Sequence, residues 1–336
     1  MSAPKTNVVY GLLGDVASAP YGTMPTLNVT DHGIQLMDQP EISDDWGFDG
    51  ARESNPGSGD TPIRTTPVGR IIKPMTCNVE NKGGGAAYSA SVKPRDLSVF
   101  LRTAGFVETG SFTGGAEKYT YTFTSPVGAP SAGGFEAYCR CTTAGTGEKW
   151  PINGAYCDWE YAVANGKPGV WTFNLQGRLN AAPGEVAWPA IIHAPAVLVP
   201  TSSPLVLSIN AVTSLAIREI KLRGGRKVQA NFPDHNPATG HGGYHPSNRA
   251  VQMEFLMVAS LFATFNPYSL RELATAIAAS FQTGATQYNR AKFALPQVQV
   301  MGVAPEVDDQ IPLTRVTCSA HSSTPILNDS LTVTFD

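Results

Sequence analysis

The feature that most constrains this chain is an internal repeat, in which one order of elements occurs twice. The first copy begins at Gly69-Arg70, follows an apolar-rich strand to Glu80 and reaches a Pro-led helix at Pro94. The second copy begins at Asn248-Arg249, follows residues 250–259 and reaches another Pro-led helix. The period is far longer than the roughly 20 to 50 residues of solenoids and propellers, so the repeat indicates two similar domains.

The repeat continues beyond the helices, because residues 156–179 and 297–321 both read as two strands joined by a turn. A length of 336 residues is enough for two domains, each with a core of its own. Between the halves lies a Pro-rich stretch typical of an extended linker. We therefore predict a first domain over 1–190, a linker over 191–206 and a second domain over 207–336.

The dominant local pattern is that of β-strands. The alternation of apolar and polar residues over 170–175 is the period-2 signature of a half-buried strand. Further strands are predicted over 119–123, 135–141, 155–163, 297–303, 313–320 and 331–335. The predicted fold is mainly β, with two tandem β-sandwich domains, each flanked by one helix, and a long loop or hairpin between strands.

Each half contains one segment with helical periodicity. Pro94 and Pro267 stand near the predicted helix starts, where proline is tolerated. We expect the apolar face of each helix to pack on its sheet. The packing residues are Leu97, Phe100 and Leu101 in the first helix, and Leu270, Leu273 and Ile277, continuing to Phe281, in the second.

Composition excludes several classes of function. Charged residues make up 15% of the chain and the net charge is −3, which gives no basic footprint for tight DNA binding. No apolar run reaches the length of a membrane span, and the first residues lack the apolar core of a signal peptide. The five cysteines form an odd set without framework spacing, so buried reduced thiols and synthesis in the cytoplasm are expected.

No motif indicates catalysis or a cofactor. Gly83-Gly84-Gly85 lacks the Lys of a phosphate-binding loop, and no Gly-x-Ser-x-Gly elbow occurs. Cys139 and Cys141 with Cys157 lack an obvious fourth zinc ligand, so we interpret them as core thiols. A hydrolase is the weakest class, because no nucleophile or paired carboxylate stands out. We expect the protein not to be an enzyme.

Two long polar excursions interrupt the strands, one over 38–67 and a shorter one over 232–246. Loops of such length inside compact domains are usually functional or disordered. The acidic run lacks the ligand order of a calcium loop, and the histidines lack the partners of a metal site. Their notable residues are Asp44, Asp45, Trp46, Asp49, Glu53 and Asp60 in the first, and His235, His241 and His245 in the second.

A series of short motifs occurs in a characteristic order. The chain opens with Tyr21-Gly22-Thr23-Met24-Pro25-Thr26 before a strand, and Val68-Gly69-Arg70 enters the next strand. Later come Leu97 to Phe106, the Tyr-Thr-Tyr-Thr-Phe run at 119–123, Gly154-Ala155-Tyr156, and Trp171 to Leu179 followed by Asn180-Ala181-Ala182-Pro183. Over residues 20–183 this order resembles the tail tube proteins, or major tail proteins, of long non-contractile-tailed phages (siphophages).

The resemblance implies a β-sandwich flanked by a helix, with a long loop that contacts neighbouring subunits and the next ring. The nine notable residues of the two polar excursions are therefore candidates for contacts between subunits or rings. The usual family pattern is one such domain per chain and six chains per ring. With two domains per chain, three chains would complete a pseudo-sixfold ring; the alternative is a hexamer whose second half decorates the outside.

The resemblance further implies a virion protein whose stacked rings form a conduit for double-stranded DNA, without specific DNA binding. Six domains giving about four strands each would form a barrel roughly 45 to 50 Å across. We expect its inner wall to carry Asp, Glu, Ser, Thr and Asn rather than Lys and Arg. The expected partners are further copies of the chain, a tape measure protein, and tail terminator or tail tip proteins.

A different class remains open, namely a carbohydrate-binding or adhesin-like β-sandwich. Trp46, Trp150, Trp159, Trp171 and Trp188 are the aromatic residues that could stack on sugars. Trp171 alternates on an apolar strand, so we assign it to the core. A binding module would stay monomeric at high concentration, whereas a tube protein would stack into rings or filaments.

Overall fold

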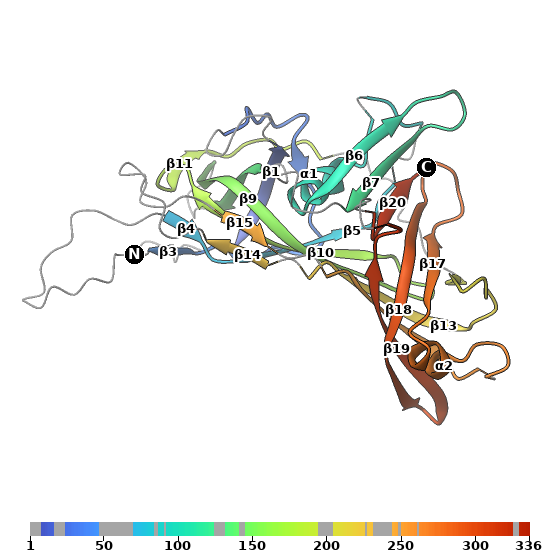
Figure 1. Cartoon of the computed structure of the whole chain (residues 1–336). Helices are drawn as coiled ribbons and strands as arrows, with labels where there is room; N and C mark the ends of the chain where they lie inside the picture. The colour runs from blue at the N-terminus through green and yellow to red at the C-terminus, as the bar shows by residue number, and fades with distance from the viewer. Residues whose placement is uncertain are drawn as a thin grey trace, which may run out of the picture.

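The computed structural model describes residues 8–16, 24–46, 70–83, 87–90, 92–123, 132–140, 145–193, 204–225, 227–230, 244–247, 250–260, 262–324 and 329–336. As the sequence predicts, the fold is mainly β (Figure 1). Within the described residues, eighteen strands belong to one antiparallel sheet system, two form a separate hairpin, and two short helices complete the fold.

The first half builds a curled sheet around helix α1. Its elements are β1 (Val9–Val16), β2 (Gly33–Ile34), β3 (Asp44–Trp46), β4 (Arg70–Ile72), β5 (Met75–Glu80), α1 (Arg95–Thr103), β6 (Phe106–Ser111), β7 (Lys118–Phe123), β8 (Gly133–Arg140), β9 (Thr146–Ala164), β10 (Val170–Leu179) and β11 (Gly184–Ala187). The predicted strands at 119–123 and 135–141 are β7 and β8, with ends shifted by one or two residues, and the alternation read at 170–175 belongs to β10. The predicted strand at 155–163 is only the second part of β9, which already begins at Thr146.

The second half is built with fewer strands and a shorter helix. Its elements are β12 (Leu207–Ile209), β13 (Ile217–Arg223), β14 (Lys227–Ala230), β15 (Tyr244–Ser247), β16 (Gln252–Val258), α2 (Pro267–Glu272), β17 (Ala276–Thr283), β18 (Ala291–Asp308), β19 (Ile311–His321) and β20 (Thr332–Phe335). The predicted pair of strands at 297–321 is the β18–β19 hairpin, which projects beyond α2 in Figure 1.

The two halves place their strands in the same hydrogen-bonded order. That order is β1–β8–β9–β10–β5 in the first half and β12–β17–β18–β19–β16 in the second. Met75 and Cys77 alternate as buried residues on β5, as Met253 and Phe255 do on β16. The sequence repeat aligns Arg70 with Arg249, which makes exposed Thr76 the equivalent of buried Phe255. The burial pattern instead makes Cys77 the equivalent of Phe255, so the sequence alignment is wrong by one residue on this strand.

The halves join edge to edge rather than facing each other across a linker. Residues 160–164 of β9 pair with 219–223 of β13, and β20 pairs with β7 of the first half. One apolar core cluster runs through both halves. Most of the predicted linker, 194–203, lies outside the described residues, so a boundary at 191–206 stays a prediction.

Helix α1 packs as predicted. Leu97, Phe100 and Leu101 are buried, and Phe100 stacks on Phe135 and Phe173 with ring centroids 5.5 and 4.8 Å apart. The helix ends before Gly105, whose positive φ of 94° suits a residue without a Cβ.

The prediction for the second helix is wrong beyond its first turns. Pro267 occupies its first turn and the Asn266 side chain caps it, but the helix ends at Glu272. Leu270 packs against the core, whereas Leu273 is 72% exposed and Ile277 lies in β17. Residues 276–283 alternate in burial because they pair with β12 and β18, and this pairing overrides the helix propensity of an Ala-rich segment.

Candidate functional site

The most extensive surface feature is one polar face of the sheet that crosses both halves. It runs over β5, β10, β9, β13, β16, β19 and β18, which are hydrogen-bonded neighbours in this order. Its side chains are exposed or half-buried: Thr76, Asn78, Glu80, Thr172, Asn174, Gln176, Asp158, Glu160, Glu219, Lys221, Arg223, Gln252, Glu254, Arg315, Thr317, Ser319 and Glu306. We call this set the polar face.

The opposite face of the same strands is buried and aromatic. Because side chains alternate along a strand, each polar residue has an apolar neighbour on this second face. Tyr161 stacks on Phe293 at 4.5 Å, and Phe293 stacks on Phe281 at 4.4 Å, so first-half and second-half rings form one stack. This core fixes which face of the sheet remains for solvent or for another molecule.

Within the polar face, cross-strand hydrogen bonds and ion pairs hold the side chains. Thr76 Oγ1 donates to Asn174 Oδ1 at 3.0 Å, and Thr172 Oγ1 donates to Asn78 Oδ1 at 2.8 Å. Such side-chain pairs between facing residues stabilise neighbouring strands. They also keep the hydroxyl and amide groups of this half of the face close to the sheet.

The three basic residues named in the polar face, Lys221, Arg223 and Arg315, each have a carboxylate beside them. Lys221 Nζ lies 3.0 Å from Glu219 Oε1, and Arg223 Nε lies 3.4 Å from Glu160 Oε1 across the β9–β13 junction. Arg315 binds both Glu254 and Glu306, and its hydrogen bonds lower the pKa of Glu306 and raise that of Arg315. Since Glu80 and Asp158 add further carboxylates, this face offers no excess positive charge to a phosphate backbone.

The sheet curves toward its polar face. Arg218 on β13 forms an ion pair with Asp308 on β18, although β16 and β19 lie between these strands. A flat sheet would hold β13 and β18 about 14 Å apart, which exceeds the combined reach of the two side chains. The polar face is therefore concave at the second half.

The junction between the halves is closed by a buried polar cluster. Asn81 Nδ2 donates to Thr283 Oγ1 of the second half at 2.9 Å and lies 3.5 Å from the Tyr161 hydroxyl. The indole Nε1 of Trp171 donates to Asn81 Oδ1 at 3.3 Å. Gly224 of the second half abuts Trp159, where an added Cβ would lie 2.3 Å from the indole nitrogen. These contacts make the junction a packed interior.

The two ends of the seven-strand run differ in how their backbone edges are covered. No described strand pairs with the outer edge of β18 over 302–308, although β19 pairs with its inner edge. At the other end, segment 35–38 lies along β5, because Met37 N donates to Asn78 O at 2.9 Å. On either side of this segment the chain pairs with β1, Ile34 with Leu12 and Glu41 with Val8. Open edges are sites where a further strand can add.

Exposed apolar side chains gather near the open end of β18. Val307 is 76% exposed and Met301 60% exposed on β18, and Ile311 on β19, Leu273 after α2 and Phe262 before α2 are also exposed. Met37, at the opposite end of the run, is 49% exposed. Exposed apolar groups beside an unpaired strand are a mark of an interaction surface.

The described residues hold no group of three or more His, Cys, Asp or Glu side chains arranged to bind a metal ion. Four cysteines, Cys77, Cys139, Cys157 and Cys318, are buried reduced thiols, as interpreted from the sequence. Burial raises the pKa of Cys318 to about 12 and that of Cys77 well above its usual value, so both stay protonated at neutral pH.

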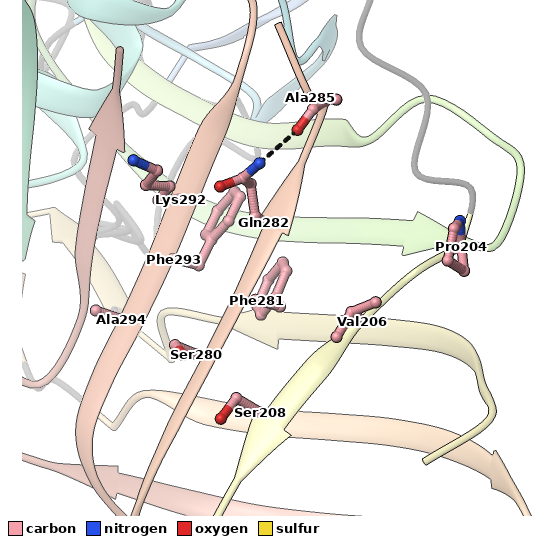
Figure 2. A pocket seen from close by; sticks show the side chains of 11 residues that line it. Pro204, Val206, Ser208, Ser280, Phe281, Gln282, Ala285, Lys292, Phe293 and Ala294 are labelled. Atoms are coloured by element: carbon pink, nitrogen blue, oxygen red, sulfur yellow. Dashed lines mark hydrogen bonds between the residues drawn. The ribbon is translucent and has the colours of Figure 1, made fainter. Parts of the chain in front are cut away.

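A pocket opens between β12, β17 and β18, and Figure 2 shows the side chains that line it. Ser208 and Ser280 contribute hydroxyls, and the Gln282 amide donates to Gly284 O at 2.7 Å. Lys292, the charged group in the lining, is engaged by Asp336 at 2.6 Å. With no His or carboxylate in the lining, the pocket lacks a base that could activate either serine.

The tryptophans do not form a sugar-binding platform in the described part of the chain. Trp159 and Trp171 are fully buried, which confirms the core assignment of Trp171, and Trp150 is buried as well. Trp188 is half-buried against Tyr138. A stacking platform needs an exposed ring face, so these residues argue against the carbohydrate-binding alternative.

The polar excursion residues predicted as subunit contacts are only partly described. Asp44, Asp45 and Trp46 form β3, which pairs with β4, and His245 lies in β15, opposite Gln229 of β14. Asp49, Glu53, Asp60, His235 and His241 lie outside the described residues. The sequence predicted a polar wall of Asp, Glu, Ser, Thr and Asn but not which residues form it, although each strand shows the alternation that defines the polar face.

A scan of protein-family models finds none that matches this chain, and a search of curated proteins likewise finds no match. Among the helices in the described residues, neither is long and apolar enough to cross a membrane.

Proposed function

We propose that this protein is a structural subunit of a siphophage tail tube, which polymerises into stacked rings and forms a conduit for double-stranded DNA. The observation that supports the proposal most strongly is the polar face, which continues from one half into the other and ends at β18, where no described strand pairs with residues 302–308 on the outer side. A wall segment of a closed barrel needs both properties. The family resemblance of residues 20–183 gives the independent sequence argument.

The chemistry of the polar face suits a wall past which DNA slides. Clustered Lys and Arg would bind phosphates and retain the duplex. Here Lys221, Arg223 and Arg315 are each matched by a carboxylate, and hydroxyl and amide side chains occupy much of the remaining surface. We therefore propose that these residues of the polar face form the acidic and neutral wall expected of the tube.

The dimensions agree with the proposal. Segment 35–38 and the seven strands from β5 to β18 supply eight neighbouring chain segments per molecule. Three molecules would then provide about 24 strands, which at a tilt of about 40° close a barrel roughly 45 to 50 Å across, wide enough for a duplex. The proposed assembly is a three-chain ring with pseudo-sixfold symmetry.

In this proposal the protein resides in the virion after synthesis in the host cytoplasm. Its partners are further copies of itself, a tape measure protein inside the tube, and terminator or tip proteins at the ends. The proposed role requires no catalysis, and DNA is expected to pass through the tube without specific contacts.

Electron microscopy of the concentrated protein tests the proposal. Hollow tubes or stacked rings with threefold symmetry are expected, with the polar face lining the lumen. Sixfold rings would keep the conduit but assign the second half to the outside. Compact monomers at every concentration, or a lumen lined by the aromatic face or by net positive charge, would contradict the proposal.

A further inference from the structure

We propose that the pocket between β12, β17 and β18 docks a peptide segment of another protein, which crosses these three strands and anchors itself by one large apolar side chain. Peptide docking is a role separate from the proposed tube function and needs no ring. It follows from a comparison of the two halves, because residues 188–192 of the chain cross the matching strands of the first half.

The strands that border the pocket have counterparts in the first half. β12, β17 and β18 take the places of β1, β8 and β9 in the strand order. The neighbouring edge strands match as well, since β11 pairs with 146–149 of β9 and β20 pairs with 291–294 of β18. We call the side of these strands that faces away from the aromatic core their outer side, and it can be compared between the halves.

In the first half, a segment of the chain itself covers this outer side. The Trp188 indole lies on β9 at Gly147, where an added Cβ would come within 2.6 Å of the ring. Its ring centroid is 6.5 Å from that of Tyr138 on β8. The Ile191 side chain reaches β1, because a Cβ added at Gly11 would lie 2.6 Å from its Cδ1. Tyr138 and Gly11 are buried as a result.

No described segment covers the outer side of β12, β17 and β18 in this way. Val206 is 43% exposed, and Ser280, Gln282 and Ala294 are exposed as well. The pocket opens there, and Figure 2 shows these side chains around it. Its volume of about 590 Å³ lies within the roughly 300 to 1,000 Å³ of ligand sites, so it can hold an anchor side chain with adjoining backbone.

The first half provides the template for the occupant. A peptide that follows the same course would place an aromatic side chain on β18 and β17, as Trp188 lies on β9 and β8. A branched aliphatic side chain three residues later would reach β12, as Ile191 reaches β1. In a second copy of this chain, residues 188–192 are already packed on that copy's own first half. We therefore assign the peptide to a different protein.

The chemistry of the pocket suits a neutral and mainly apolar peptide. Much of its lining is apolar, and the hydroxyls of Ser208 and Ser280 can pair with backbone groups of the peptide. Lys292 Nζ, the cation of the lining, lies 2.6 Å from Asp336 Oδ2, so the pocket offers no uncompensated positive charge to an acidic or phosphorylated ligand.

Peptide binding to the full-length protein tests the assignment. One probe is a fluorescein-labelled peptide with the sequence of residues 184–193, and the other is a displayed decapeptide library in which Trp and Ile are fixed three positions apart. Peptides selected from the library are synthesised with the same label. We expect saturable binding of at least one labelled peptide, measured by fluorescence anisotropy.

Two substitutions in the pocket should block this binding. Ala294→Arg and Ser280→Arg each place a long charged side chain in the pocket, and both positions are exposed, so folding should be unchanged. We expect either variant to bind the peptide at least about tenfold more weakly, because the arginine occupies the space of the anchor. Thr109→Arg, exposed on β6 outside the lining, is the matched control and should bind like wild type.

A measurement on the wild-type protein locates the peptide without any substitution. The bound peptide carries photoreactive benzoylphenylalanine in place of its Trp, and mass spectrometry identifies the cross-linked residues. We expect cross-links to β17 or β18. Cross-links to β8 or β9 would mean that the peptide displaces residues 188–192 from the first half, and would overturn the proposed site.

Three other results would also overturn the proposal. The first is that no labelled peptide binds, and the second is that both pocket variants bind as tightly as wild type. The third is that Ala294→Arg loses ring-sized species in sedimentation while Thr109→Arg keeps them, which would assign the pocket to a second copy. Peptide binding without tubes would retain the docking site and reject the conduit, whereas tubes without peptide binding would do the reverse.

Discussion

β9 and β18 are matching strands with different surroundings. Along β9, Trp159, Tyr161 and Val163 are buried; Trp159 packs among first-half rings, and Tyr161 stacks on Phe281 and Phe293 of the second half. Along β18, Val303 is half-buried and Pro305 and Val307 are exposed. The sequences reflect this difference, since large aromatic rings on β9 are replaced by Val and Pro on β18. Part of the burial of β9, at Tyr161, therefore comes from the second half, whereas no described strand pairs with the outer side of β18 over 302–308.

The largest effect is expected from removing an aromatic side chain on the covered strand. Trp159→Ala should lower the free energy of unfolding by about 3 to 5 kcal/mol, because it leaves a cavity among Phe106, Phe123 and Trp171. Val307→Ala on the open strand should change it by no more than about 0.5 kcal/mol in the unassembled protein. Urea unfolding of both variants measures the contrast; equal losses would mean that β18 is covered within the single chain.

The polar cluster that closes the internal junction gives the next effect. Asn81→Ala removes the amide that accepts from Trp171 Nε1 and donates to Thr283 Oγ1, so the buried indole N–H loses its partner. We expect a loss of about 1 to 3 kcal/mol in unfolding free energy. Asn174→Ala, which removes only the exposed hydrogen bond from Thr76, is the matched control and should lose less, about 0.2 to 1 kcal/mol. If the two losses are alike, the junction is not a packed interior.

Sequence reasoning predicted the hairpins and the first helix but not the second. The alternation over 170–175 could be read directly because a sheet with one buried face imposes period 2. The apolar residues over 270–281 fit a helical spacing as well as an alternating one. Residues 276–283 form the strand β17 because β12 and β18 pair with them on either side. That information is not local, so no window of the sequence contains it.

The candidate site was less predictable than the fold, for a related reason. Alternating residues are visible on each strand in the sequence, but only the pairing of β9 with β13 shows that Glu160 and Arg223 lie on one continuous surface. The open edge of β18 likewise depends on the absence of a neighbouring strand in the described chain. The proposed subunit loop could not be compared, since Asp49, Glu53 and Asp60 lie outside the described residues.

Adding positive charge to the polar face tests whether the β9–β10 hairpin and the β18–β19 hairpin both line the lumen of the proposed tube. The triple variant Thr172→Lys, Asn174→Lys and Thr317→Lys adds lysines to both halves of the face and should bind duplex DNA inside assembled tubes, with affinity falling steeply as salt rises. DNA held in the lumen should be protected from nuclease. The control variant Thr109→Lys, Thr113→Lys and Thr286→Lys carries the same charge elsewhere, so any DNA it binds should be digested.

Digestion of the DNA bound by both variants would show that the polar face lies on the outside. Protection of the DNA bound by both variants would show that the polar-face lysines and the control lysines lie on the same side of the tube wall. Either result would break the link between the polar face and a lumen, while leaving the folding comparison of β9 and β18 intact.

The smallest effect concerns the ion pairs that fix the open hairpin. Hydrogen bonds from Arg315 lower the pKa of Glu306, so in the folded state this carboxylate is charged down to a lower pH than in the unfolded chain. Its stabilising contribution is complete above the unfolded pKa, near about 4.3, and is lost as the pH falls through the lower folded value. Arg315→Gln should remove that part of the acid sensitivity and slightly lower stability at neutral pH.

Thermal unfolding of wild type and Arg315→Gln from neutral pH down to about pH 2 measures this difference, with the two midpoints converging on acidification. Because Arg315 joins β16, β18 and β19 through Glu254 and Glu306, weakening it frees the β18 edge from the rest of its sheet. Acid-induced loss of rings should then begin at a higher pH in the variant than in wild type. If ring loss has the same pH profile in both proteins, the hairpin does not depend on this ion pair for its position at the subunit junction.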